Sequence, residues 1–144
     1  MDRDENARQG RRNQSAGKRW QQDCAAWLRA NGWPAAGYEI RNRSSDLIGT
    51  WDLAVECTIT GWDKIWIKLD QAKRDAAERG LIDYCVWKKR NGTTDAGKGA
   101  VLMLAELFFP LVQRLERLEH AELDAAEAYD RGYRNGQRAR EEAV

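Results

Sequence analysis

The sequence predicts an α/β fold in which helices pack on the faces of a β-sheet, followed by a long C-terminal helix. Helix-like and strand-like patterns are interspersed between residues 15 and 110, and this mixture is typical of such folds. The 144 residues suffice for about one domain of ~150 residues. We therefore expect a flexible basic arm over residues 1–14, an α/β core over 15–110 and a C-terminal helix and tail over 111–144.

The first helix is predicted from apolar spacing. Trp20, Cys24, Trp27 and Leu28 recur at intervals that place them on one face of a helix. Ser15 is a suitable N-terminal cap, and Gly32 ends the pattern. The preceding residues are polar and rich in arginine without any periodicity, so we expect them to form the flexible arm.

The segment 51–60 alternates in polarity with the period of a β-strand. An antiparallel strand with one solvated face would give the same alternation. Further patterns predict a short strand at 38–40, a helix at 62–79, strands at 81–88 and 100–104, and a helix from Leu111 with Pro110 in its first turn. The alternating segment has two faces: Trp51, Leu53, Val55, Cys57 and Ile59 on one, and Asp52, Ala54, Glu56, Thr58 and Thr60 on the other.

Composition narrows the possible functions. Apolar residues make up 42% and charged residues 33% of the chain, and no apolar run reaches the ~18 residues of a membrane span. The N-terminal residues lack a hydrophobic segment, so we expect a cytoplasmic protein without membrane association. Three widely spaced cysteines and one histidine argue against zinc. Gly97-Lys98-Gly99 lacks the spacing of a phosphate-binding loop, so we expect no small-molecule cofactor.

The charge is unevenly distributed. Residues 1–104 contain 18 Lys and Arg against 14 Asp and Glu, a net charge of +4, whereas residues 105–144 contain 6 against 9, a net charge of −3. A mildly basic body permits a nucleic-acid partner without requiring one.

Two carboxylates suggest a metal site. Asp46 precedes the alternating strand and Glu56 lies in its middle. Oxygen ligands of this kind suit magnesium, which usually takes one or two carboxylates and completes its octahedron with water and phosphate oxygens. A magnesium ion held there, or manganese as an alternative, can polarise a phosphodiester and activate a water. In the alternative interpretation Glu56 is solvated and Asp46 is a turn residue.

The stretch from Gly17 to Leu104, about 88 of 144 residues, resembles the PD-(D/E)XK nuclease superfamily, and within it the archaeal-type and phage Holliday junction resolvase-like proteins. The resemblance lies in four segments taken in order: GKRWQQDCAAWLRANGW, IRNRSSDLIG, WDLAVECT and WDKIWIKLDQAKRDA. It implies a mixed central sheet flanked by helices, as in restriction endonucleases, and magnesium-dependent cleavage of DNA.

By position, Asp46 and Glu56 match the two acidic residues of the motif and would bind the metal. The motif's lysine falls at Thr58, which cannot supply positive charge. Members of the superfamily sometimes carry this lysine on the next helix, where Lys68 is our first choice and Lys64 our second. Gln71, on the same flank, would position water or phosphate. Both lysines are alternatively solvent-exposed side chains of an ordinary helix face.

The family's glutamate on the first helix is also replaced. Gln21 stands at its position, and Asp23 lies on a different side of the helix. An amide oxygen can accept a hydrogen bond but brings no charge to a metal.

Basic residues beside the predicted site suit a DNA backbone. We expect contacts from five residues near the site: Lys18, Arg19, Arg41, Arg43 and Ser44. The cluster 88–90 either extends this basic track or is ordinary surface charge. Trp62 and Trp66 are expected to pack against the sheet, with stacking on an unpaired base as the alternative.

The leading hypothesis is therefore a magnesium-dependent endonuclease that hydrolyses phosphodiester bonds, most naturally in branched DNA. The alternative is a catalytically degenerate nuclease fold that binds DNA, and a third is an interaction protein that acts through residues 111–144. Leu111, Leu115 and Leu118 form either core packing or a dimer seam. The resemblance implies a homodimer, because a junction needs two symmetric cuts.

Overall fold

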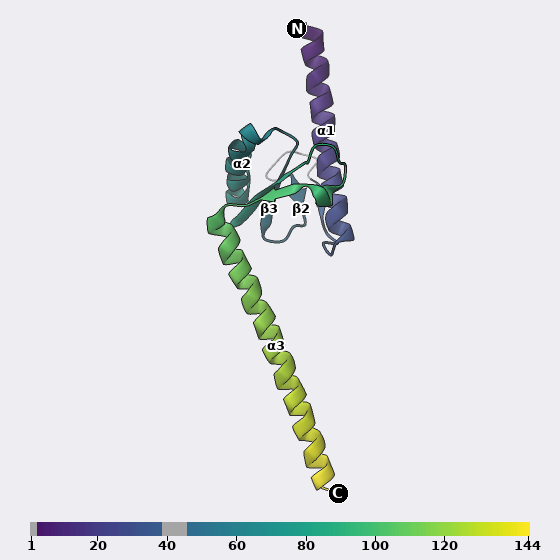
Figure 1. Ribbon diagram of the computed structural model, residues 1–144, viewed down its shortest axis with the longest axis vertical. Coiled ribbons are helices and arrows are strands. Elements are labelled where there is room, and N and C mark those ends of the chain that lie inside the picture. Colours follow the sequence, from purple (N-terminus) through teal and green to yellow (C-terminus); the bar gives the residue numbers. More distant parts are fainter. Residues whose placement is uncertain (1–2, 39–45) are drawn as a thin grey trace. The chain divides into compact units, whose positions relative to one another are not determined.

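A computed structural model describes residues 3–38 and 46–144 of the chain. Residues 3–38 and 46–104 belong to one compact unit and residues 105–144 form a second. The first unit has three layers, with a small sheet between helices α1 and α2 (Figure 1). Its helices and strands are α1 (Arg3–Ala30), β1 (Gly37–Tyr38), β2 (Leu47–Ile48), β3 (Leu53–Thr58), α2 (Ile65–Glu78), β4 (Asp83–Lys88) and β5 (Ala100–Leu102).

The central sheet is mixed and has the order β3-β4-β5. Strands β3 and β4 run parallel, with Glu56 paired to Val86 and Thr58 paired to Lys88. Strand β5 pairs antiparallel to β4. The expectation of a mixed sheet flanked by helices is therefore confirmed.

Helix α2 connects the two parallel strands and packs on both of them. A parallel pair needs such a crossover, because its strands cannot be joined by a tight turn. The helix buries a stripe of apolar residues, and a short 3₁₀ turn at Trp62–Lys64 leads into it. The buried stripe is Ile65, Leu69, Ala72 and Ala76.

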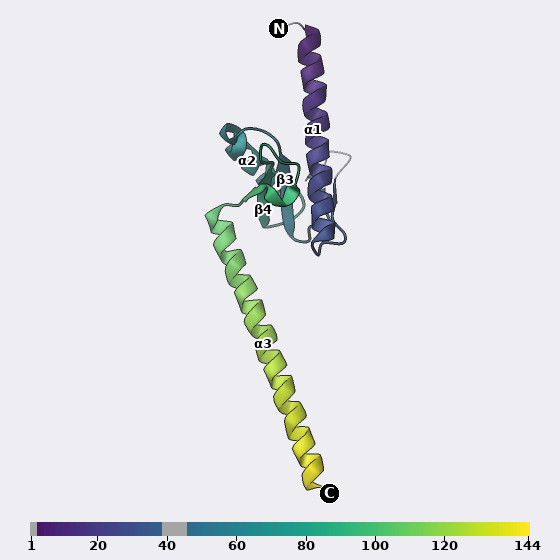
Figure 2. The same cartoon turned by 45° about the vertical axis from the view of Figure 1, so that its right-hand side comes forward.

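Helix α1 covers the other side of the sheet, and Figure 2 shows this arrangement from a second direction. Trp20 is 1% exposed, and its indole nitrogen donates to the carbonyl of Trp87 at 3.1 Å. The Trp87 indole in turn donates to Ala96 at 3.2 Å and meets the ring of Trp27 edge-on. These aromatic contacts fix the C-terminal half of α1 against β4.

A two-stranded sheet of β1 and β2 places Asp46 next to β3. Gly37 pairs with Ile48 and Tyr38 with Leu47. Gly49 follows with φ of +68°, and a Cβ there would lie 1.9 Å from the carbonyl oxygen of Ala35. Only glycine permits this approach, so the turn that follows Asp46 depends on it.

Helix α3 (Ala105–Glu142) is the second unit. None of its residues is buried. Leu115 and Leu118 are 56% and 63% exposed, so the stripe that they form along the helix is available for contact.

Several predicted boundaries were wrong. Helix α1 begins at Arg3 and not near Ser15, so residues 3–14, expected to form a flexible arm, are helical. Their side chains are all exposed, which explains why no apolar pattern marked this part of the helix. The last helix begins at Ala105, so Pro110 lies inside it and not in its first turn, and the boundary between the units falls at residues 104 and 105.

The strands are shorter than the patterns suggested. Trp51, expected to begin a strand, has φ of +51° and lies in the turn before β3, where its ring stacks on Trp33 at 4.1 Å between centroids. The strand predicted at 38–40 is described only up to Tyr38. No helix in the described ranges is long and apolar enough to cross a bilayer.

Candidate functional site

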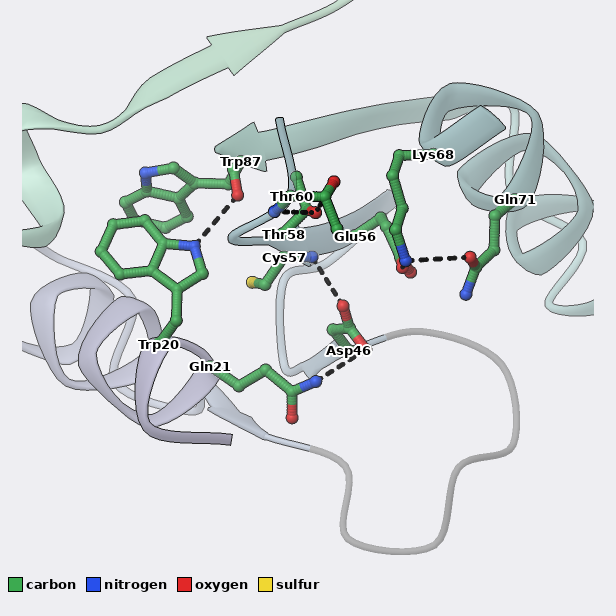
Figure 3. Close-up of polar contacts among 10 residues, drawn as sticks. All are labelled: Trp20, Gln21, Asp46, Glu56, Cys57, Thr58, Thr60, Lys68, Gln71 and Trp87. Atoms are coloured by element: carbon green, nitrogen blue, oxygen red, sulfur yellow. Dashed lines mark hydrogen bonds and ion pairs between the residues drawn. The ribbon is translucent and has the colours of Figure 1, made fainter. Parts of the chain in front are cut away.

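Asp46 lies at the free edge of β3 and is half-buried (Figure 3). Its Oδ2 atom accepts a hydrogen bond from the backbone N–H of Cys57 at 2.7 Å. Its Oδ1 atom accepts a second hydrogen bond from the side-chain amide of Gln21 at 2.9 Å. The carboxylate thus satisfies an edge N–H of the sheet that has no strand partner, and this contact holds it next to the strand residue Glu56.

Glu56 points toward α2 from the middle of β3 and is 3% exposed. Its Oε1 atom lies 3.4 Å from the ammonium nitrogen of Lys68. Its Oε2 atom is buried and, among the described residues, has no hydrogen-bond partner. A buried carboxylate oxygen without a partner is costly, so this atom marks a place where a ligand would be stabilising.

The two carboxyl groups influence each other's ionisation. The pKa of Glu56 is raised to about 8, chiefly by burial and next by the charge of Asp46, against the lowering effect of Lys68. Burial likewise raises the pKa of Asp46, against the lowering effect of the Cys57 N–H. Two neighbouring carboxyl groups with raised pKa values are difficult to ionise together unless a cation is bound. This is the behaviour expected of a cation-binding site.

Helix α2 contributes one flank of the site. Lys68 donates to Glu56 and, also at 3.4 Å, to the side-chain oxygen of Gln71. Lys68 and Gln71 are one turn apart and therefore share a face of the helix. Lys64, our second choice for the cation, is exposed in the 3₁₀ turn that precedes the helix. The structure thus brings Lys68 to the carboxylates.

Helix α1 contributes Gln21. Its side-chain amide contacts Asp46 and brings no charge to the site. Lys18 and Arg19 lie on the exposed surface of the same helix, in the turn before Gln21. Arg41, Arg43 and Ser44, expected to contact DNA, lie outside the described residues.

The interpretation of Glu56 and Thr58 as a solvated strand face was wrong. Both residues are 3% exposed, because α2 covers that side of the sheet. The Thr58 hydroxyl pairs with that of Thr60 at 2.8 Å. A glutamate is seldom fully buried unless it is paired, and Glu56 has Lys68 as its partner.

Sequence reasoning missed one residue near the carboxylates. Asp75 is close enough to Asp46 and Glu56 for its charge to raise the pKa of both carboxyl groups. Its position one turn after Gln71 was the available signal. Lys88, part of the basic cluster noted in the sequence, is the strand partner of Thr58, and this pairing was not predicted.

The chemistry available to this site is that of two carboxylates, an ammonium group and two amides. Within the described ranges, no three His, Cys, Asp or Glu side chains gather as metal ligands. Magnesium, however, often uses only one or two protein carboxylates and keeps several waters. The donor set therefore fits a hard cation better than zinc, which prefers nitrogen and sulfur ligands.

Comparison of the chain with protein-family models, with curated proteins and with solved structures found no match.

Proposed function

We propose that the protein is a magnesium-dependent DNA endonuclease with a restriction-endonuclease-like core, similar to Holliday junction resolvases. The observation that carries the proposal is the convergence of Asp46, which precedes β2, with Glu56 of β3 and Lys68 of α2. These are the acidic positions and the relocated lysine that the resemblance implies. The proposal includes a cytoplasmic location, which suits three cysteines that are all unpaired.

The residues fit magnesium because one carboxylate oxygen of the site is buried and has no partner among the described residues. Asp46 and Glu56 would hold the ion, with manganese as an alternative. Bound there, the ion would supply Lewis-acid polarisation of a phosphodiester and activation of a water.

The chain's own residues would position the substrate and balance its charge. The Lys68 side chain is 25% exposed beside Glu56, and its ammonium group would stabilise the negative charge that develops on the phosphate during hydrolysis. Gln71 accepts a hydrogen bond from Lys68 and so orients it, and the Gln71 amide would donate to water or phosphate.

Binding of the DNA backbone is assigned to Lys18, Arg19, Arg41, Arg43 and Ser44. Branched DNA as the substrate and a homodimer as the active form are parts of the proposal that come from the resemblance. The exposed stripe on α3 supports the dimer, since Phe108, Leu111, Leu115 and Leu118 follow the three-and-four spacing of a coiled-coil seam.

One observation favours a second candidate, a protein that binds DNA without cutting it. Gln21 occupies an oxygen of Asp46 with an amide N–H, where the family's glutamate would add a charge for the metal. Together with Thr58 in place of the motif lysine, this would weaken metal binding.

The two candidates are separated by incubating the protein with a labelled four-way junction, a nicked duplex and a linear duplex, in magnesium or EDTA. Magnesium-dependent cutting of a branched substrate supports the endonuclease. Binding of the junction without cutting, in either magnesium or manganese, assigns the protein to the second candidate.

A further inference from the structure

A basic pocket lies at the end of β4, next to the carboxylate site and separate from it. It has a volume of about 380 Å³ and is lined by four cationic side chains and an aromatic ring. Among the described residues that line it, none is acidic. The residues concerned are Trp62, Lys88, Lys89, Arg90 and Lys98.

Lys88 shows that this pocket is more than surface charge. The residue is only 5% exposed, yet no described carboxylate forms an ion pair with it. Its ammonium nitrogen donates to the carbonyl of Lys89 at 3.3 Å and lies 5.2 Å from the centre of the Trp62 ring. Burial of an ammonium group with such weak compensation is unfavourable. An anion in the pocket would remove that cost.

Trp62 gives the pocket a second recognition element. We expected this residue to pack against the sheet, but it is 59% exposed. An exposed indole with a cation over it presents a flat apolar surface to a base. Lysine side chains would bind a phosphate, and the indole ring would stack on an unpaired base next to it.

The sheet register places this pocket beside the proposed cleavage site. Lys88 pairs with Thr58, which lies two residues beyond Glu56 on the same face of β3. Two residues of strand span about 7 Å, so a DNA strand at the carboxylates can extend into the pocket.

We propose that this pocket binds an unpaired nucleotide of a DNA strand, with the base stacked on Trp62 and its phosphate on Lys88, Arg90 and Lys98. The proposal rests on the proposed function for the identity of the strand as DNA. The pocket itself does not require the protein to cut DNA.

The test measures binding of a short labelled oligothymidine to the full chain by fluorescence anisotropy in EDTA, where no cutting occurs. Two exposed residues of the pocket are changed, so that folding is not at stake: Trp62→Leu and Lys98→Gln. Their controls are Trp66→Leu and Lys73→Gln, which alter an exposed tryptophan and an exposed lysine of α2 outside the pocket. Circular dichroism confirms that each variant is folded.

We expect Trp62→Leu to weaken binding about 10-fold or more, since one base loses its stacking partner. Lys98→Gln should lower the slope of log K against log salt by about 0.7, the value for one phosphate of a single strand. The two controls should stay within about 2-fold of wild type. Equal binding by Trp62→Leu and Trp66→Leu would overturn the proposal.

A competition experiment distinguishes binding of a DNA strand from binding of a free nucleotide. Thymidine monophosphate and inorganic phosphate should displace the oligothymidine only at concentrations about 100-fold higher than an unlabelled strand. Displacement by thymidine monophosphate at concentrations equal to those of the strand would overturn the assignment to DNA. A wild type that binds the oligothymidine in EDTA but cuts no DNA in magnesium would support the pocket and contradict only the endonuclease, so the two failures are distinguishable.

Discussion

Lys68 and Glu56 join helix α2 to strand β3 through a contact of 3.4 Å between the ammonium nitrogen and Oε1. The Glu56 carboxylate is buried and the Lys68 side chain is partly exposed. The positive charge of Lys68 therefore lies at the boundary between the protein interior and solvent. In a nuclease of the proposed type this is where the charge of a scissile phosphate would be balanced.

Replacement of Lys68 tests that role. We expect Lys68→Met to lower the rate of DNA cleavage about 100-fold or more, because one group that stabilises transition-state charge is lost. The measurement is single-turnover cleavage of a four-way junction in magnesium. Lys64→Met is the matched control, since Lys64 is an exposed lysine one turn earlier. A rate that falls for Lys64→Met and not for Lys68→Met would refute the assignment.

The raised pKa of Glu56 predicts an unusual dependence of stability on pH. The folded protein holds this proton up to a pH of about 8, whereas an ordinary glutamate releases it near 4.5. The folded state therefore binds more protons than the unfolded state between these values, and the free energy of unfolding falls as the pH rises through this window. The loss is on the order of a few kcal/mol.

Thermal unfolding in EDTA at pH 5, 6, 7 and about 8 measures this effect. The midpoint should fall by about 5 °C or more across the series in the wild type. Glu56→Gln, which stays neutral, should remove most of the decrease. A wild-type midpoint that rises with pH in this range would show that Glu56 is ionised in the folded protein.

A variant of Gln21 tests the metal site by adding a carboxylate to it. Gln21→Glu places a third carboxylate beside Asp46 in place of the amide that donates to it. Without metal we expect the variant to lose about 1–3 kcal/mol of stability, because a hydrogen bond is replaced by repulsion. With magnesium it should gain more stability than wild type, since the ion binds only the folded state.

The control for this variant is Gln22→Glu, which adds the same charge at an exposed position of α1. Magnesium should raise the unfolding midpoint of Gln21→Glu by several degrees and leave Gln22→Glu close to wild type. Identical responses of the two variants to magnesium would argue against metal binding at Asp46.

The leucine stripe of α3 predicts a dimer that single changes disrupt. Leu118 belongs to the stripe, whereas Leu123 is equally exposed and lies off it. Leu118→Asp should shift the sedimenting species from two chains to one, because a charge in an apolar seam is strongly unfavourable. Leu123→Asp should stay dimeric. A wild-type chain that sediments as a monomer at all concentrations would remove the dimer from the account.

Elements with a buried face were predictable from the sequence. The stripe from Ile65 to Ala76 indicated α2, and the apolar spacing of Trp20 and Cys24 indicated the docked half of α1. Residues 3–14 are helical but bury nothing, so they carry no apolar signal from which a helix could be predicted. The sequence also indicated a separate C-terminal helix. Its start was placed too late, at Leu111, because the helix begins at Ala105, before the leucine stripe.

The site was predictable only in part. The resemblance predicted Asp46 and Glu56, with Lys68 chosen before Lys64, and the structure places Asp46, Glu56 and Lys68 close together. Alternation in 51–60 could not distinguish a solvated face from one covered by a helix, so the burial of Glu56 was not foreseen. The pairing of Thr58 with Lys88 depends on register between strands thirty residues apart, which local patterns do not encode.

We propose that Asp46 and Glu56 together support hydrolysis of DNA. Single-turnover cleavage of a labelled four-way junction in magnesium tests it, with wild type, Asp46→Asn and Glu56→Gln compared at equal binding saturation. We predict cutting by the wild type that EDTA abolishes, and none by either variant although both still bind the junction. Cutting by Glu56→Gln at the wild-type rate would contradict the account.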